Sequence, residues 1–166
     1  VVFILIMISI SGYSKADNIY TYVGDKFTST NGSATTDDSV KIMIRSRDEL
    51  KGLVDLNFDD PFDEIEMYIY IQGRSYNVAE LIKAQKSSSV NQLNHVTLAI
   101  KDEEVIGWVI FISVPGKDGK GIQLHAMKDD NDKYFESITL GFNTETMKSD
   151  YHAWVLTKGD WSIVKN

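Results

Sequence analysis

Alternation of apolar and polar residues is the dominant pattern of this chain. From position 65 to position 71 every second residue is Ile or Met, and the residues between them are Glu or Tyr. A period of two places alternate side chains on opposite faces of an extended chain and indicates a half-buried strand. The same alternation spans 40–45, and a shorter segment rich in β-branched and aromatic residues spans 19–23. We therefore predict strands over 19–23, 40–45 and 65–71.

Beyond His95 the pattern indicates strands separated by short turns, with no further helix. The predicted strands span 96–100, 105–114, 122–127, 134–142, 151–157 and 161–164. Gly, Pro, Asp and Asn fill the connections, and connections this short favour an antiparallel meander because parallel neighbours need a long crossover. Segment 105–114 is apolar almost throughout, which predicts a central strand covered on both faces, one of them by a helix.

Two segments have helical spacing instead. Ser46 with Glu49 three residues later forms a capping-box pattern, and Leu residues follow at helical spacing, so we predict a short helix over 47–54. Asn77 offers a second N-cap, and we predict another helix over 78–86. With 166 residues and no internal repeat or linker, the chain has room for one domain. The predicted fold is a single α+β domain: mainly an antiparallel twisted sheet, with a C-terminal meander and two short helices packed on one side.

The start of the chain has the pattern of a secretory leader. The first ten residues are apolar except for one Ser, and Ser14 and Ala16 supply small residues three positions and one position before a cut after Ala16. We expect a signal peptide over 1–16 and a mature domain over 17–166. A bilayer span needs roughly 20 apolar residues, so we expect no stable membrane insertion after cleavage. The alternative is that the apolar run forms a first strand of the core.

The chain contains no Cys. Disulfides, thiol catalysis and thiolate metal ligation are therefore excluded. An exported domain without disulfides is more typical of a bacterial periplasm than of a small extracellular module, so we expect a periplasmic location, with secretion as the alternative.

Charge limits the classes of partner. The sequence has 24 acidic and 17 basic residues, a net charge of −7, and no segment combines clustered Lys and Arg with aromatic residues. We therefore expect no nucleic-acid partner. The acidic balance fits either a solvated surface or a basic partner.

Candidate chemistry is sparse. His95, His125 and His152 lack the spacing of a local metal motif, and each fits an ordinary half-buried strand position. The acidic run 129–132 lacks the Gly and the spaced ligands of a calcium loop, and 116–121 lacks the Lys and hydroxyl residue of a phosphate loop. We therefore assign no catalytic residue, no metal and no cofactor.

Export, small size, acidity and the lack of catalytic motifs together favour a non-catalytic binding protein of the inhibitor or immunity type, with a basic or cleft-bearing protein partner. Loops carried on a rigid sheet commonly bind partners, and clustered charge speeds encounter with the opposite charge. The predicted contacts are the aspartates of two acidic turns, Asp59, Asp60, Asp63, Asp129, Asp130 and Asp132.

Two alternatives remain at this level. One is a small periplasmic hydrolase that uses His125 or His152 with a nearby carboxylate, because folding can bring these groups together. The other is a ligand-binding module whose pocket is lined by aromatic residues, since the chain has 3 Trp, 8 Tyr and 7 Phe. An enzyme is the less favoured class. The sequence leaves the oligomeric state open.

Overall fold

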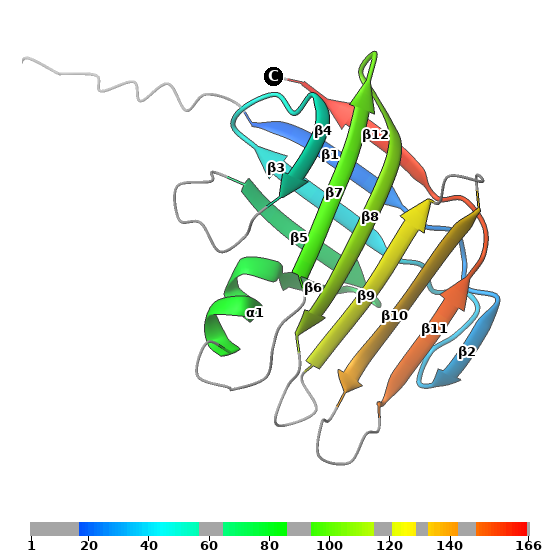
Figure 1. Ribbon diagram of the computed structural model, residues 1–166. Coiled ribbons are helices and arrows are strands. Elements are labelled where there is room, and N and C mark those ends of the chain that lie inside the picture. The colour runs from blue at the N-terminus through cyan, green and yellow to red at the C-terminus, as the bar shows by residue number, and fades with distance from the viewer. Residues whose placement is uncertain are drawn as a thin grey trace, which may run out of the picture.

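Two antiparallel sheets face each other and enclose one apolar interior (Figure 1). The computed structural model describes residues 17–56, 65–85, 94–114, 121–128, 133–142 and 149–165. The described strands are β1 (Asn18–Val23), β2 (Ser29–Gly32), β3 (Lys41–Ser46), β4 (Gly52–Leu56), β5 (Ile65–Ile71), β6 (Arg74–Asn77), β7 (Asn94–Lys101), β8 (Glu104–Val114), β9 (Gly121–Lys128), β10 (Tyr134–Phe142), β11 (Tyr151–Val155) and β12 (Asp160–Val164). The helix in the described part of the chain is α1 (Val78–Gln85). The predicted signal peptide, 1–16, lies outside the described residues.

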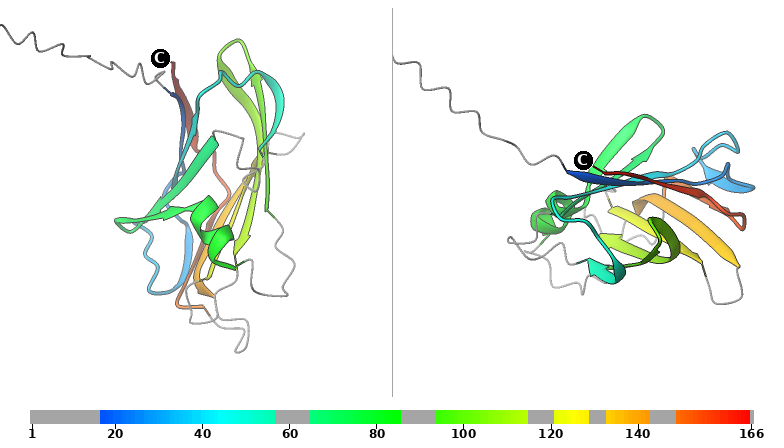
Figure 2. Two further views of the ribbon diagram at one scale, coloured as in Figure 1. Left: turned by 90° about the vertical axis from the view of Figure 1, so that its left-hand side faces the viewer. Right: turned by 90° about the horizontal axis from the view of Figure 1, so that it is seen from above.

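Strand order divides the chain into a five-stranded and a seven-stranded sheet. The first has the order β12-β1-β3-β5-β6 and the second β2-β11-β10-β9-β8-β7-β4, as two layers in Figure 2. Strands β7 to β11 are successive antiparallel neighbours, which confirms the predicted C-terminal meander. The expectation of one sheet is wrong, because β12 leaves the meander and pairs with β1.

The two sheets share one core because every long strand has an apolar side. In the five-stranded sheet Ile44 and Ile69 are fully buried, and Leu98 and Ile112 of the seven-stranded sheet are fully buried opposite them in the same cluster. Burial of apolar surface on this scale is the main favourable term in folding. The alternation read from the sequence therefore corresponds to an inner and an outer face on each sheet.

Helix α1 confirms the second predicted helix. The Asn77 side chain accepts a hydrogen bond from the Glu80 amide at 3.1 Å, which is the N-cap contact. Val78 and Ile82 are buried, and the helix contacts β5, β6 and β8. In Figure 1 it lies at one edge of the two layers, beside β6.

The first predicted helix, over 47–54, is wrong. Gly52 has a φ of 72°, outside the helical range, and begins β4, which pairs with β7 at the edge of the seven-stranded sheet. The Ser46 hydroxyl donates to the Asp48 carbonyl at 2.8 Å instead of capping a helix. Pairing with a distant strand has overridden a weak local preference. Strands β2 and β6 were not expected either.

Burial of β8 also differs from the prediction. Its inner side chains are buried from Trp108 to Val114, whereas the alternate outer residues from Val105 to Ser113 are only half-buried. None of the described helix residues lies over this outer face (Figure 1). The strand is apolar on both sides, but only one side is in the core.

One carboxylate breaks the apolar pattern of the interior. Glu136 lies on the inner face of β10 and is 1% exposed. Among the described residues neither oxygen has a hydrogen-bond partner of ordinary geometry, although the Tyr22 hydroxyl and Val40 amide lie close enough to favour the charged form slightly. Burial dominates and raises the pKa of Glu136 to about 8. A Cβ at Gly24 would overlap the carboxylate, so only glycine leaves room for it.

We predict that Glu136→Gln flattens the dependence of stability on pH. The folded carboxyl keeps its proton up to about pH 8, whereas the unfolded chain releases its proton near pH 4.5. The contribution of Glu136 is therefore complete below pH 4.5 and falls, by roughly 5 kcal/mol in total, as pH rises from 4.5 through 8. Gln cannot ionise and loses this dependence. Urea unfolding across this pH range measures the effect.

The matched control is Glu104→Gln, at an exposed position. It removes the same charge and should leave the slope of the wild-type curve in place. Parallel curves for Glu136→Gln and the wild type would contradict the assignment.

Candidate functional site

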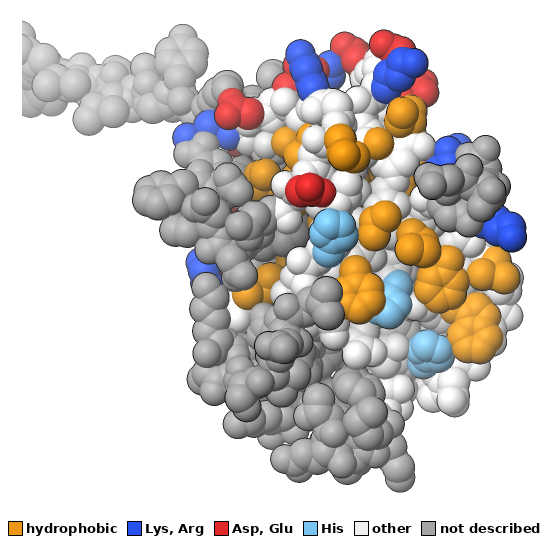
Figure 3. All heavy atoms as spheres, viewed as in Figure 1, with side chains coloured by type: hydrophobic (Ala, Val, Ile, Leu, Met, Phe, Trp, Pro, Cys, Tyr) orange, Lys and Arg blue, Asp and Glu red, His pale blue; other side chains and the backbone are white. Residues whose placement is uncertain are grey.

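The outer face of the seven-stranded sheet carries all three histidines of the chain. His95 precedes buried Val96, His125 lies between buried residues of β9, and His152 lies between buried residues of β11. Because strand side chains alternate, each imidazole points away from the core. Figure 3 shows the three rings on one face, among apolar side chains.

Strand register aligns these residues into rows. His95 is opposite Phe111, which is opposite His125, and His125 continues through Ser137 to Trp154. One neighbouring row runs Thr97, Val109, Met127, Phe135, and the other runs Ser113, Gln123, Thr139, His152. These three rows, from β7 to β11, define what we call the histidine face. None of its residues is Asp, Glu, Lys or Arg.

The rings on this face contact one another. The Phe111 and His125 rings stack with centroids 4.2 Å apart and an interplanar angle of 20°. Partial burial lowers the pKa of His125, because the neutral imidazole is the easier form to desolvate. His152 lies edge-on to Trp154 at 5.4 Å, and its Nδ1 is 2.8 Å from the Thr139 hydroxyl.

His95 belongs to a hydrogen-bonded chain at the edge of the face. The Thr97 hydroxyl donates to the carboxylate of Asp55, on the edge strand β4, and lies 2.9 Å from His95 Nε2. A hydroxyl has one proton to donate, so Nε2 of His95 must be the donor in the second bond. Asp55 thus reaches His95 only through Thr97.

These positions give the hydrolase alternative no support. None of the three histidines is hydrogen-bonded directly to a carboxylate of the described residues, and all three lie on an open sheet face. The walls of the described cavities contain none of them. In the described ranges no group of three or more His, Cys, Asp or Glu is placed to hold a metal ion.

Aromatic residues other than those of the histidine face mostly fill the core. Trp108 packs against Tyr22, Tyr134 and Trp161, with ring centroids 5.7, 5.8 and 6.0 Å away. Trp108 and Trp161 also border a cavity of about 260 Å³. By contrast, Trp154 is 42% exposed. These aromatic residues therefore form two groups. One packs in the interior around Trp108, and the other lies on the histidine face.

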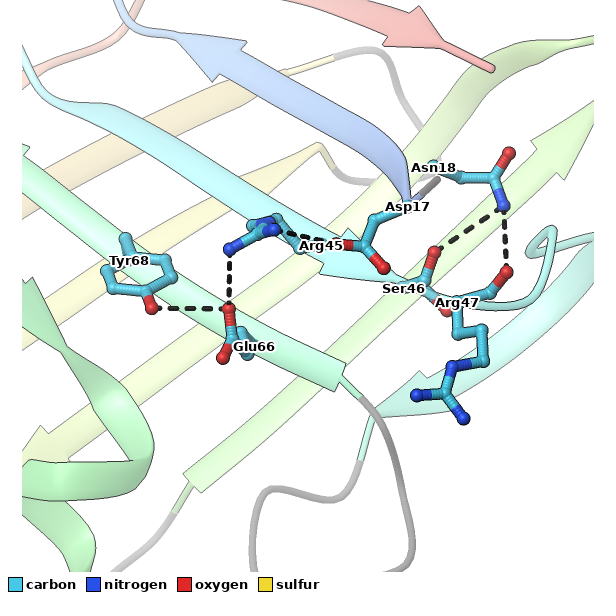
Figure 4. A network of polar contacts seen from close by, with 7 residues as sticks. All are labelled: Asp17, Asn18, Arg45, Ser46, Arg47, Glu66 and Tyr68. Atoms are coloured by element: carbon cyan, nitrogen blue, oxygen red, sulfur yellow. Dashed lines mark hydrogen bonds and ion pairs between the residues drawn. The ribbon is translucent and has the colours of Figure 1, made fainter. Parts of the chain in front are cut away.

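The outer face of the other sheet is different, because it carries a network of paired charges around Arg45 (Figure 4). Arg45 on β3 forms ion pairs with Asp17 at 2.6 Å and with Glu66 on β5 at 3.0 Å. The Tyr68 hydroxyl donates to the same Glu66 carboxylate at 3.2 Å. These contacts are those of a solvated surface that satisfies its own polar groups.

The six aspartates predicted as contacts, Asp59, Asp60, Asp63, Asp129, Asp130 and Asp132, all lie outside the described residues. The sequence analysis treated each histidine separately and missed the histidine face. The alternation along each strand was a usable signal for the direction of each imidazole, since each His lies next to apolar residues. The pairing register between strands brings the three histidines onto one face. The pattern within a single strand does not reveal this register.

No family model, curated protein or solved structure is significantly similar to this chain. Among the residues that the structure describes, no helix is both long and apolar enough to cross a membrane. The fold and the site therefore define the protein only as an antiparallel two-sheet domain with an uncharged, histidine-bearing sheet face.

We predict that Phe111→Ala raises the pKa of His125 towards the ordinary imidazole value of about 6.5. Removing the stacked ring exposes the imidazole to water and relieves the desolvation that disfavours its charged form. A proton NMR titration of the His Cε1 resonances measures this shift. Trp154→Ala is the control, because Trp154 contacts His152 instead. An unchanged His125 midpoint in Phe111→Ala would show that the stacking does not set its pKa.

Proposed function

We propose that this chain is an exported, non-catalytic binding protein that recognises a protein partner through the histidine face. The observation that carries the proposal is the combination of exposed apolar side chains with the lack of charged residues across three rows of one sheet. Met127 is 41% exposed and Trp154 is 42% exposed at positions where each could turn towards a partner. No helix of the described residues covers them.

The composition of the face fits a protein interface better than a solvated surface. Contiguous exposed apolar patches are uncommon on soluble proteins and mark interaction sites when they occur. Interface centres are enriched in Trp, Phe and Met and depleted in charged residues. Phe111, Met127 and Trp154 supply the first group, and the polar members Ser137, Thr139 and the imidazoles can form hydrogen bonds.

The shape of the face favours a macromolecular partner. It spans five neighbouring strands, and the described cavities all lie elsewhere. A small ligand would leave most of such a surface in water, whereas a protein surface can cover it. The partner's matching patch should be apolar and aromatic.

Charge around the face points to a partner with a basic rim. The chain has a net charge of −7, and Asp55 stands at the edge of the central rows. Long-range attraction of this kind raises the rate of encounter more than it raises affinity. The predicted acidic turns, which include Asp59 and Asp129, remain proposed contacts at such a rim. This pattern supports the inhibitor or immunity class, in which a small acidic protein blocks a basic partner.

We predict that Met127→Glu with Trp154→Glu lowers partner affinity at least roughly tenfold, because the exposed apolar centre is lost and two charges must be desolvated. A photo-crosslinker on the histidine face of the mature protein first identifies the partner in the native organism. Titration with the purified partner then measures affinity for each variant.

The matched control is Val23→Glu with Val164→Glu. These residues are 46% and 54% exposed on the outer face of the five-stranded sheet, so the change in charge and exposure is similar. The control should bind as the wild type does. Equal affinity for both double variants would remove the histidine face from the proposal.

A separate variant changes all six predicted aspartates to Asn. We expect slower association at low salt and little change at moderate salt, because rim charges act mainly on encounter. Stopped-flow association with the purified partner at two salt concentrations checks this. A large affinity loss that persists at moderate salt would move the interface centre to the acidic turns.

A further inference from the structure

A second candidate site lies between the sheets at one end of the molecule, away from the histidine face. A cavity of about 370 Å³ opens where the β5–β6 hairpin of one sheet approaches the ends of β9, β10 and β11 of the other. We call it the end cavity; the side chains used below are Arg74, Tyr76, Leu81, Leu140, Asp150 and Tyr151. Its volume is in the range of sites for small ligands.

Two opposite charges, those of Arg74 and Asp150, line this cavity. Arg74 and Asp150 form no side-chain hydrogen bond or ion pair with any described residue, and they do not pair with each other. The cation of another cavity is different: Lys165 forms ion pairs with Glu49 at 2.5 Å and Glu103 at 2.7 Å. As far as the described residues show, the end cavity therefore presents one guanidinium and one carboxylate that are unpaired.

Asp150 is held in position by its surroundings. Its amide donates to the Leu140 carbonyl at 3.2 Å, and its own carbonyl accepts from the Ser33 amide at 2.9 Å. Its carboxylate lies against Gly141, where a Cβ would come within 2.8 Å of an oxygen. Gly141 also has a φ of 68°, which favours glycine. The backbone of Asp150 is thus fixed at the rim, and its carboxylate lies beside Gly141.

The wall of the cavity is tied together by Asp38. The Asp38 carboxylate accepts hydrogen bonds from the Tyr151 hydroxyl at 3.2 Å and from the Gln72 amide at 3.0 Å. These bonds join β11 to the β5–β6 turn, so the two sides of the cavity are held together. Leu140 is 5% exposed and, with Leu81 and Tyr76, supplies apolar wall.

We propose that the end cavity binds a small zwitterion with an apolar side chain, either an apolar amino acid or an apolar dipeptide. The ligand carboxylate accepts two hydrogen bonds from the planar Arg74 guanidinium, and its ammonium group donates to Asp150. Its side chain packs on Leu81 and Leu140. A ligand with only one charge would leave the other protein charge unpaired. This site is independent of the proposed function of the histidine face.

The test uses calorimetric titration of the mature protein with L-leucine and with L-leucyl-L-phenylalanine. We expect at least one of them to bind saturably. The matched ligands are the N-acetylated form, which lacks the ammonium group, and the C-terminal amide, which lacks the carboxylate. Each should bind roughly tenfold or more weakly than the free zwitterion, because one charge-assisted contact is lost.

Variants assign each contact. Arg74→Gln should lower the affinity for the free zwitterion roughly tenfold and leave the affinity for the amide unchanged. Asp150→Asn should lower the affinity for the free zwitterion by a similar factor and leave the affinity for the acetylated ligand unchanged. Arg74→Lys keeps the positive charge but lacks the planar guanidinium, so its affinity for the free zwitterion should lie between those of the wild type and Arg74→Gln. Lys101→Gln and Asp160→Asn, exposed changes outside this cavity, are the controls.

Two results overturn the proposal. One is the lack of saturable binding of either zwitterion up to about 10 mM. The other is binding that Arg74→Gln and Asp150→Asn leave unchanged. Circular dichroism spectra and thermal unfolding midpoints close to those of the wild type show that any loss of binding in a variant is local.

Discussion

Burial of two apolar sheet faces in one interior is the constraint on which the rest of this structure depends. Because strand side chains alternate, each residue that faces the core sets the direction of its neighbours. Buried Leu124 and Ala126 turn His125 outwards, and buried Tyr151 and Ala153 turn His152 outwards in the same way. The histidine face is thus a consequence of core packing. On the other sheet the same constraint turns Arg45 and Glu66 outwards, where they form an ion pair.

The interior also contains an exception to its own rule. Glu136 occupies an inward position of β10 and remains there because its carboxyl keeps a proton at neutral pH. The space for it comes from Gly24, and the Tyr22 hydroxyl lies close by. A buried neutral acid of this kind makes the fold progressively less stable as pH rises from about 4.5 to about 8. It does not contribute to the histidine face, which is on the opposite side of the same sheet.

Local patterns were enough to predict most of the strands and α1. The period of two marks β3 and β5, and the Asn77 cap marks the start of the helix. Non-local pairing accounts for the errors. The residues of β4 were predicted to be helical, but they pair with β7, and β12 pairs with β1 from the far end of the sequence. For the site, the sequence predicted only that each histidine is an ordinary half-buried strand residue. Only register between strands shows that His95, Phe111 and His125 share one row.

The most direct test of the account is histidine footprinting of the free protein and of its complex with the partner. Diethyl pyrocarbonate modifies accessible imidazoles, and mass spectrometry reports the extent of modification at each position. If the histidine face is the binding surface, His95, His125 and His152 react in the free protein and are protected together in the complex. Equal modification of all three in the free and bound protein would contradict the central claim, because the partner would then bind elsewhere.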